Sequence, residues 1–508
     1  MPGIRSRRAR RGAELDSVAP PGDLRHFRAC GCSAESPSRG RFLANTVKTV
    51  PRESRAIGIV LALFQDPDIA AQAGEHVGGT TAVHPVGLAV LLALIALAVL
   101  APRRLSGLPV ILLLCFIPAA QRIVIATIDF TFIRLLMLGV WLRIFVRREL
   151  RPITWNHLDR VMIVWAFVSV VFGTVQGMTL TLLVNRLGTA VDAMMIYFFF
   201  RLLIRDADDL IRLAMQFMVC SFGVAMFFFV ESRTQQNMFY VFGGVPQFTD
   251  IRDGRLRCQG AFAHAILAGC FWACLVPFYF ARAWMGRGWA MPIFGTVAAL
   301  LIVLWCASST PIMAVLFGIV GGAAFLLRGG LRWLRWLIFF WLCILHFVLM
   351  KMPVWHLLAR VDIIGGSTGW HRYHLVDKFI ERFDEWWLTG TLHTGHWGPG
   401  LHDVTNQFVA EGVAGGVWRL FLFCVAVWLA FAGVSRSLRM PGRPTAERYI
   451  AWALGTALFM HCMNFIAVSY FEQIVVLWYM TLAAISSLTL VPGARVERQI
   501  AEAAMAPA

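Results

Sequence analysis

Apolar runs alternate with shorter polar segments from about residue 84 to residue 490. Most runs hold about 17–25 residues, which is long enough for a helix to cross a hydrocarbon core of about 30 Å. Segments inside lipid must be helical, because only a helix satisfies its own backbone hydrogen bonds there. The pattern predicts an all-α polytopic membrane protein with about 12–13 transmembrane helices. The predicted spans are residues 84–101, 107–120, 129–146, 158–176, 187–204, 210–230, 260–281, 291–307, 311–327, 333–350, 404–434, 446–468 and 472–490.

Two longer polar segments, residues 231–259 and 351–403, interrupt this pattern. The second predicts a long extracytoplasmic loop that contains an amphipathic helix. It divides the chain into transmembrane helices at 57–350, the loop at 351–403, C-terminal transmembrane helices at 404–491 and a cytoplasmic tail at 492–508.

Residues 1–56 are rich in Arg, Ser and Pro and show no apolar period, so we expect them to be disordered. They lack the apolar core of a signal peptide. Two interpretations are open: a basic cytoplasmic tail, or an over-extended start of the reading frame that is absent from the natural protein. The apolar segment 57–64 is too short to span a membrane by itself.

The composition supports a membrane protein, because 58% of the 508 residues are hydrophobic and only 15% are charged. The formal net charge is +17. Arginines lie mostly at alternate ends of successive spans, where the positive-inside rule accounts for them without a nucleic-acid partner. This rule places residues 231–259 and 351–403 on the extracytoplasmic side. The 11 cysteines show no disulfide framework and no zinc-binding spacing.

Three arginines, Arg252, Arg255 and Arg257, occupy alternate positions just before the span at 260–281. The topology places them outside, where Arg is disfavoured. Arg is well shaped for bidentate phosphate binding, so Arg257, the nearest to the membrane, is a candidate pyrophosphate ligand. Ion pairing with Asp250 and Asp253 is the structural alternative.

Residues 369–387 predict an amphipathic helix that lies on the membrane surface or caps the bundle. Its apolar face is Val376, Phe379, Ile380, Phe383 and Trp387, and its polar face is His371, His374, Lys378, Glu381 and Glu385. Arg372 lies four residues before Val376 and therefore projects from the apolar face. A charge there needs a partner or a ligand, which makes Arg372 a second candidate, with a salt bridge within the loop as the competing explanation.

The loop also carries two His-x-x-His pairs, His371/His374 and His393/His396. No carboxylate stands at the helical spacing that would complete a hydrolase site, so we predict no metal. The glycine-rich stretch 390–400 is consistent with a mobile loop.

A polar motif, residues 402–416, opens the span at 404–434. His402 is a candidate general base near neutral pH. Asp403 is a candidate catalytic partner and a good helix N-cap, while Asn406 is a candidate ligand for phosphate at the helix N-terminus. Gly412, Gly415 and Gly416 would allow another helix to pack closely.

These features together resemble the O-antigen ligase and O-antigen polymerase superfamily. The resemblance covers most of the chain from about residue 84 and rests on GRLRCQGAFAHAILAG, GWHRYHLVDKFI and DVTNQFVAEGVAGG. It implies transfer of a glycan from undecaprenyl pyrophosphate to an acceptor saccharide on the outer face of the inner membrane. It also implies no metal or other cofactor, and other polysaccharide-assembly membrane proteins as partners.

Within this resemblance, Arg257 and Arg372 match arginines that hold the pyrophosphate. The family's candidate base is a histidine directly before the asparagine, but Thr405 precedes Asn406 here. His402 and Asp403 are the nearest substitutes, and the departure favours a polymerase or another chain-joining enzyme over a ligase. The alternative function is a polysaccharide or lipid-linked-sugar transporter or flippase. Such a protein should show internal repeats, broken helices and charges within spans. The sequence shows no clear repeat, and Arg134 and Asp192 are the few candidate charges within spans.

Overall fold

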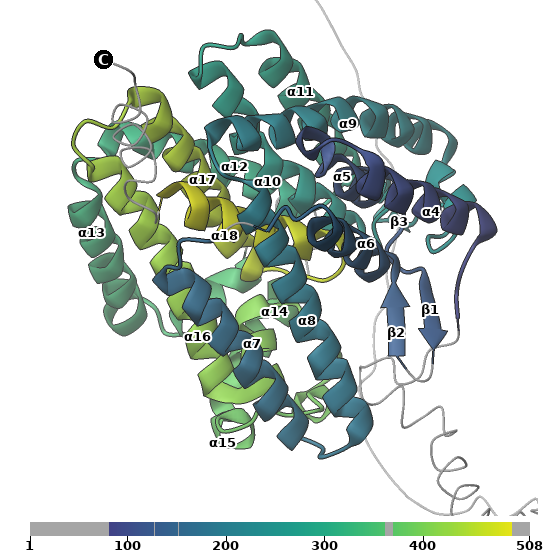
Figure 1. Cartoon of the computed structure of the whole chain (residues 1–508). Coiled ribbons are helices and arrows are strands. Elements are labelled where there is room, and N and C mark those ends of the chain that lie inside the picture. The colour runs from purple at the N-terminus through teal and green to yellow at the C-terminus, as the bar shows by residue number, and fades with distance from the viewer. Residues whose placement is uncertain (1–80, 126–127, 151, 361–368, 490–508) are drawn as a thin grey trace, which may run out of the picture. The chain divides into compact units, whose positions relative to one another are not determined.

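The computed structural model describes residues 81–125, 128–150, 152–360 and 369–489. The predicted tails at 1–56 and 492–508 and the short apolar segment 57–64 lie outside these residues. Each predicted span contains a helix (Figure 1). These helices are α4 (Pro85–Leu100), α5 (Leu108–Phe116), α6 (Phe132–Val146), α7 (His157–Val175), α8 (Leu180–Leu203), α9 (Ala207–Thr234), α10 (Ala265–Trp284), α11 (Ala290–Trp305), α12 (Ser309–Ala323), α13 (Leu331–Ile344), α16 (Gln407–Arg439), α17 (Thr445–Phe465) and α18 (Gln473–Thr489).

Six of these helices are long and apolar enough to cross a membrane, or seven if the bent segment from residue 333 to residue 360 counts as one span. They identify a multi-pass membrane protein. Three others, α4, α11 and α18, are apolar but shorter, and α5 covers only nine residues. Many large apolar side chains on α6, α7, α9 and α13 are exposed, as lipid-facing side chains would be.

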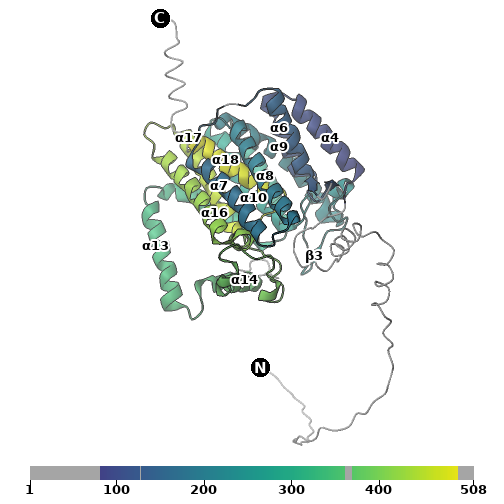
Figure 2. The ribbon, with the colours of Figure 1, turned by 60° about the horizontal axis from the view of Figure 1, so that its bottom comes forward.

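The helix α10 lies at the centre of the bundle and packs against α9, α11, α12 and α17. Its side chains from Leu267 to Leu275 are fully buried, with Trp272 the largest of them. In contrast, α13 stands apart from the other helices in both views (Figures 1 and 2). The core therefore consists of the helices around α10.

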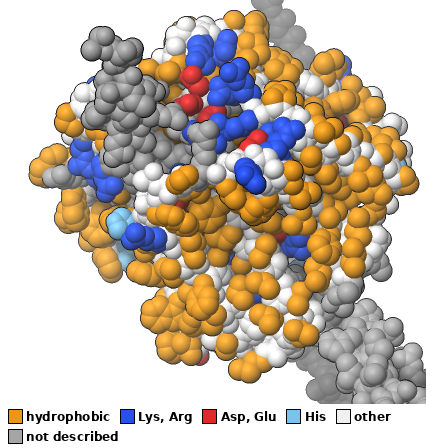
Figure 3. All heavy atoms as spheres, viewed as in Figure 1, with side chains coloured by type: hydrophobic (Ala, Val, Ile, Leu, Met, Phe, Trp, Pro, Cys, Tyr) orange, Lys and Arg blue, Asp and Glu red, His pale blue; other side chains and the backbone are white. Residues whose placement is uncertain are grey.

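The arginine-rich helix ends meet on one face of the bundle. Arg201 at the end of α8 pairs with Asp159 of α7 at 2.9 Å and donates to Ser487 of α18. Arg443, before α17, donates to the carbonyl of Leu488. Figure 3 shows Lys and Arg side chains gathered in the upper part of the visible surface, above a mainly hydrophobic region. The sequence predicted arginines at alternate ends of successive spans. In the folded bundle, such helix ends lie on the same face.

Two short hairpins, which the all-α prediction lacked, join helices. Strand β1 (Arg122–Ile125) pairs antiparallel with β2 (Ile128–Thr131), and β3 (Ile251–Arg252) pairs with β4 (Arg255–Leu256). Asp253 and Gly254 at the second turn both have positive φ, the conformation that a tight two-residue turn requires. An Asp-Gly pair between short polar strands was the signal for this hairpin.

The helix α16 is broken near its start. Gly415 (φ −171°, ψ 25°) and Gly416 (φ 69°, ψ −169°) are non-helical, so a shorter segment at 407–414 precedes a longer one. Residues 417–439 are about 35 Å long at 1.5 Å per residue, which suffices to cross a membrane. The predicted N-cap Asp403 is wrong, because Asn406 caps the helix by accepting from the backbone N–H groups of Phe408 and Val409. The asparagine lies directly before the first helical turn, whereas Asp403 lies further upstream.

The long loop folds over the start of α16. It contains α14 (Gly369–Glu381) and α15 (Phe383–Trp386), drawn below α16 in Figure 2. A small separate core holds them in place, formed by Leu375, Phe379, Trp386, Trp397, Leu401 and Val409. A methyl group on Gly412 would lie 2.6 Å from the ring of Phe379, so this glycine does allow a close helix contact.

The single amphipathic helix predicted at 369–387 is wrong in two respects. The chain leaves helical geometry at Arg382, and Ile380, Phe383 and Trp387 are about half exposed. The break turns these side chains outward and brings Trp386 onto Phe379, with ring centroids 3.8 Å apart. The stretch 390–400 is not simply a mobile loop either, because Thr394 and Trp397 are buried within it.

Candidate functional site

A buried carboxylate holds the β3–β4 hairpin against the bundle. Glu231, near the end of α9, is fully buried and accepts hydrogen bonds from the backbone of Gln259 (3.0 Å) and Gly260 (3.1 Å) and from the hydroxyl of Thr249 (2.9 Å). The backbone N–H of Cys258 also donates to the Trp305 carbonyl, at the end of α11. Sequence analysis did not identify Glu231, because a single acidic residue after an apolar run is also typical of a helix end exposed to solvent.

Replacing Glu231 with alanine should lower the free energy of unfolding by about 2–4 kcal/mol, because two backbone donors lose their acceptor in a buried place. A shift in the thermal unfolding midpoint of the purified protein measures this effect. Glu231→Gln keeps one oxygen acceptor and should lose less. Equal stability of Glu231→Ala and the parent protein would contradict this anchoring role.

Arg257 directly follows strand β4 of the hairpin and forms no ion pair with any described residue. Its backbone N–H donates to the Asp250 carbonyl, while Asp253 contacts Arg252 at 3.8 Å in an exposed position. The expected pairing of Arg257 with Asp250 or Asp253 is therefore absent from the described contacts. Burial lowers the pKa of Arg257, and the nearby positive charge of Arg252 lowers it further.

Arg372 of α14 is only 9% exposed, as its position on the apolar side predicted. Its Nε donates to the carbonyl of Ala467 at 3.0 Å, and its Nη2 donates to the hydroxyl of Thr310 at 3.2 Å. Both partners are neutral, no carboxylate among the described residues pairs with it, and Nη1 has no hydrogen-bond partner there. The expected competing salt bridge is thus not among the described contacts. Burial lowers the pKa of Arg372.

The structure places these arginines near the end of α11 and the start of α12. The charge of Arg252 lowers the pKa of both Arg257 and Arg372, so it lies within electrostatic reach of both. Arg252 has Asp253 at 3.8 Å, whereas neither Arg257 nor Arg372 forms an ion pair with a described residue. Buried cations of this kind are unfavourable unless an anion or water lies beside them. We call Arg252, Arg257 and Arg372 the arginine cluster.

Asn406 lies close to Arg372 through a shared backbone segment. Its Nδ2 donates to the carbonyl of Ile466 at 3.1 Å, next to the Ala467 carbonyl that Arg372 binds. The side-chain oxygen of Asn406 is committed to capping α16. The preceding hydroxyl, Oγ1 of Thr405, is buried and has no hydrogen-bond partner among the described residues. An unsatisfied buried hydroxyl next to Asn406 is consistent with a missing polar ligand.

His402 and Asp403, the proposed catalytic pair, are both exposed. The backbone carbonyl of Asp403 lies 3.1 Å from Nε2 of His371, but neither proposed side chain forms a hydrogen bond or an ion pair with a described residue. Their position at the surface of the long loop neither tests nor supports the base assignment. His396 instead contacts the Glu385 carboxylate at 2.7 Å. In the described part of the chain, no three His, Cys, Asp or Glu side chains are grouped as metal ligands.

A cavity of about 350 Å³ with a mainly apolar lining lies within the helices. Residues 470–472, which belong to the same connection as the Ala467 carbonyl that binds Arg372, contribute to its lining. Its lining includes the Glu411–Arg419 ion pair and Asp192, whose partner is Arg134. Arg134 of α6 donates to both oxygens of Asp192 on α8, at 2.8 and 2.6 Å. Arg419 of α16 donates to Glu411 at 2.8 Å across the helix break. Charged groups inside a membrane protein usually mark a functional site, so this cavity belongs to the candidate site.

The cavity also has an aromatic wall. Its rings come from Trp165, Phe465, Tyr470, Trp478 and Tyr479. The indole N–H of Trp165 donates to Glu411 at 3.0 Å, and the Arg419 guanidinium lies 5.1 Å from the Trp165 ring centroid. Sequence reasoning noticed Arg134 and Asp192 as charges within spans and included Glu411 in the polar motif at 402–416, but it missed Arg419. The sequence could have indicated this ion pair, because residues 411 and 419 are charged and lie within an otherwise apolar run.

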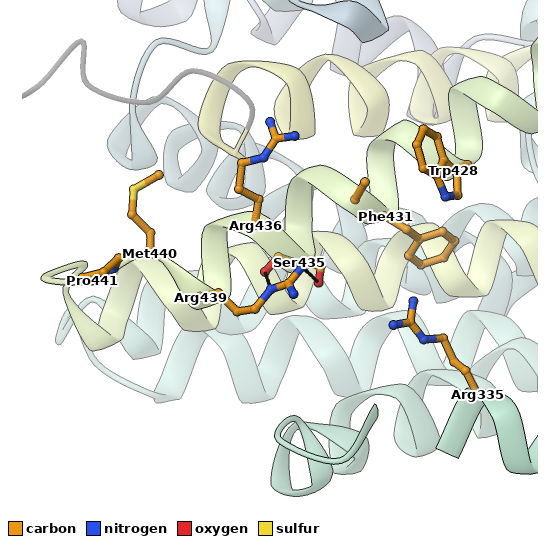
Figure 4. Close-up of a pocket in the computed structure, with 9 residues that line it drawn as sticks. Arg335, Trp428, Phe431, Ser435, Arg436, Arg439, Met440 and Pro441 are labelled. Atoms are coloured by element: carbon orange, nitrogen blue, oxygen red, sulfur yellow. Dashed lines mark hydrogen bonds between the residues drawn. The ribbon is translucent and has the colours of Figure 1, made fainter. Parts of the chain in front are cut away.

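Another hollow, of about 610 Å³, lies between α13 and the basic end of α16 (Figure 4). Arg335, Arg436 and Arg439 contribute to its lining together with Trp428 and Phe431. Arg439 donates to the carbonyl and the hydroxyl of Ser435, at 3.2 and 3.0 Å. No site residue predicted from the sequence lines this hollow. The candidate site therefore lies at the opposite end of α16.

No protein-family model and no curated protein matches the chain.

Proposed function

We propose that this protein is a metal-independent membrane glycosyltransferase. It joins a saccharide carried on undecaprenyl pyrophosphate to an acceptor sugar, in the assembly of O-antigen or exopolysaccharide. The observation that carries the proposal is Arg372, a buried guanidinium with only neutral partners among the described residues. A pyrophosphate would supply the missing negative charge, and the arginine cluster would stabilise it as the leaving group.

The proposal includes a topology of about 12–13 spans with the arginine cluster on the extracytoplasmic side. The gathering of basic helix ends on one face supports this orientation, because the arginine cluster lies at the opposite helix ends. The long loop, which carries α14, would then cover an active site on the outer face of the inner membrane. A lipid-linked donor would approach from the bilayer and a polar acceptor from water.

A transporter or flippase of lipid-linked sugars is the second candidate, because two observations favour it. The helix α16 is interrupted at Gly415 and Gly416, and the Glu411–Arg419 ion pair and Asp192, the partner of Arg134, line a cavity inside the helices. Interrupted helices and intramembrane charges are typical of transporters. The arginine cluster favours the transferase, because a leaving pyrophosphate requires fixed cations more than a passing headgroup does.

The two functions differ in whether a bond forms without a sealed membrane. Protein purified in detergent would be incubated with an undecaprenyl-pyrophosphate-linked saccharide and an acceptor saccharide. Release of undecaprenyl pyrophosphate together with an extended glycan is the expected result. Movement of the lipid-linked saccharide across proteoliposome membranes, with no bond formed in either preparation, would overturn the transferase and favour the flippase.

A further inference from the structure

Three carboxyl groups line the cavity of about 350 Å³: Asp192, Glu411 and Glu472. Asp192 is held by Arg134 through two hydrogen bonds. Glu411 accepts from Arg419, from the indole of Trp165 and from the side-chain amide of Gln407. The charges of these two carboxylates are compensated, and their oxygens are occupied by strong donors.

Glu472 differs from the other two because it forms no ion pair with any residue that the structure describes. Among the described residues, the backbone N–H of Ala263 is the one group that stabilises its ionised form. Burial raises the pKa of Glu472, since it disfavours the charged form, and the Ala263 bond offsets part of this rise. The residue also has a positive φ of 58°, unusual for a side chain larger than glycine. A carboxylate in such an environment is a stronger proton acceptor than one in water.

The rest of the cavity lining suits an uncharged sugar. The aromatic rings of Trp165, Trp478 and Tyr479 can pack against the C–H faces of a pyranose. Nη1 and Nη2 of Arg419 form no hydrogen bond to a described residue, although the side chain lines the cavity. They can donate to sugar hydroxyl oxygens, while the paired carboxylates can accept from sugar hydroxyl groups.

The cavity and the arginine cluster share one wall. The connection 466–472 carries Glu472 at one end and contributes the Ala467 carbonyl that binds Arg372. On the cavity side, its Tyr470 N–H donates to Gln407 at 2.7 Å. The segment that follows the β3–β4 hairpin supplies Ala263, the partner of Glu472. A donor at the arginine cluster and an acceptor in the cavity would therefore meet at this connection.

We propose that the cavity binds the acceptor saccharide and that Glu472 is the general base of the transfer. The Glu472 carboxylate takes the proton of the attacking hydroxyl, whose oxygen forms the new bond to the anomeric carbon. The bond from that carbon to the pyrophosphate oxygen breaks, and undecaprenyl pyrophosphate leaves with the bonding electrons. This inference rests on the proposed function, and it assigns the base to a cavity residue in place of His402 and Asp403.

The charged and titratable groups around Glu472 fix the expected pH dependence. The other titratable or charged residues that line the same cavity are Asp192, Glu411, Arg419, Tyr470 and Tyr479. His264 does not line the cavity but contacts the ring of Phe471, the residue before Glu472. Glu472 must be ionised to act as a base, so kcat should fall as the pH falls through its pKa. Because this pKa is raised from the ordinary 4.5, the acid limb should lie above that value.

Glu472→Gln tests the assignment, because glutamine keeps an oxygen for the Ala263 N–H but cannot take a proton. We expect kcat for transfer to a sugar hydroxyl to fall about 100-fold or more and the acid limb of the pH profile to disappear. Azide attacks as an anion and needs no base. The variant should therefore form glycosyl azide from the undecaprenyl-pyrophosphate-linked saccharide at a rate within about threefold of the parent protein.

Glu381→Gln is the matched control, because Glu381 is exposed on α14 and pairs only with Lys378 among the described residues. It should leave both rates unchanged. Unchanged transfer and pH profile in Glu472→Gln, with an active parent protein, would overturn the base assignment and leave the transferase intact. Equal loss of transfer and azide reaction would show a structural role instead. An inactive parent protein would overturn the proposed function itself.

Discussion

Arg372→Ala is expected to lower glycan transfer by about 100–1,000-fold while the protein remains folded and inserted. The guanidinium is buried, has neutral partners and belongs to a cluster of like charges, so its removal takes a destabilising charge out of the fold. The thermal unfolding midpoint should therefore stay the same or rise as activity falls. Transfer of saccharide from undecaprenyl pyrophosphate and the unfolding midpoint, measured on the same preparation, check both parts.

Arg382→Ala is the control for this experiment. Arg382 lies just beyond α14. Its side chain is 42% exposed and pairs with Glu385 at 2.8 Å, so its loss should change transfer by less than about twofold.

Arg372→Lys should recover little activity, because one ammonium group cannot reproduce the fork that reaches both Ala467 and Thr310. Arg257→Ala should also lose transfer. Full activity in both the Arg372 and Arg257 alanine variants would remove the basis for a pyrophosphate site.

Gly416→Ala is expected to destabilise the protein by about 3 kcal/mol or more and to displace the long loop. Its backbone angles, φ 69° and ψ −169°, fall in a region that is essentially restricted to glycine. A methyl group there would also lie 2.3 Å from the carbonyl oxygen of Leu388. The loop segment after α15 would have to move, and Arg372 with it. Faster proteolysis between α14 and α16 and a lower unfolding midpoint would report this change.

Gly322→Ala on α12 provides the comparison, because a methyl group at Gly322 meets nothing within 4 Å. This substitution in a helix should stabilise the protein by up to about 1 kcal/mol. If Gly416→Ala were as stable and as resistant to proteolysis as Gly322→Ala, the break in α16 would not hold the loop in place.

The positions of the helices could be predicted from the sequence because apolar length is a local property. Each predicted span contains a helix, although α8 begins at Leu180 rather than at residue 187. The burial of Arg372 could also be predicted, since it stands four residues before Val376. The break in α16 could not, because two adjacent glycines are equally compatible with close helix packing. Only the contact between Gly416 and Leu388 distinguishes the two cases.

The polar contacts of the site were beyond sequence reasoning because they join distant segments. Arg372 binds Ala467 and Thr310, which lie 95 and 62 positions away. Trp165 and Glu411 are separated by 246 positions. No periodicity identifies such partners. Glu472 was overlooked for a related reason: it lies at the edge of an apolar run, where an acid usually faces water, and only the fold turns it toward a cavity.

We expect the connection 466–472 to couple the two parts of the candidate site, the arginine cluster and the cavity, thermodynamically. It contacts Arg372 and Asn406 on one side and lines the cavity on the other. If donor binding at the arginine cluster shifts this connection, the affinity of the cavity for the acceptor changes. Acceptor binding then changes the affinity for the donor by the same factor. The apparent affinity for the lipid-linked donor should then vary with acceptor concentration. Donor and acceptor would not be recognised independently, and premature hydrolysis of the donor would be reduced when no acceptor is bound.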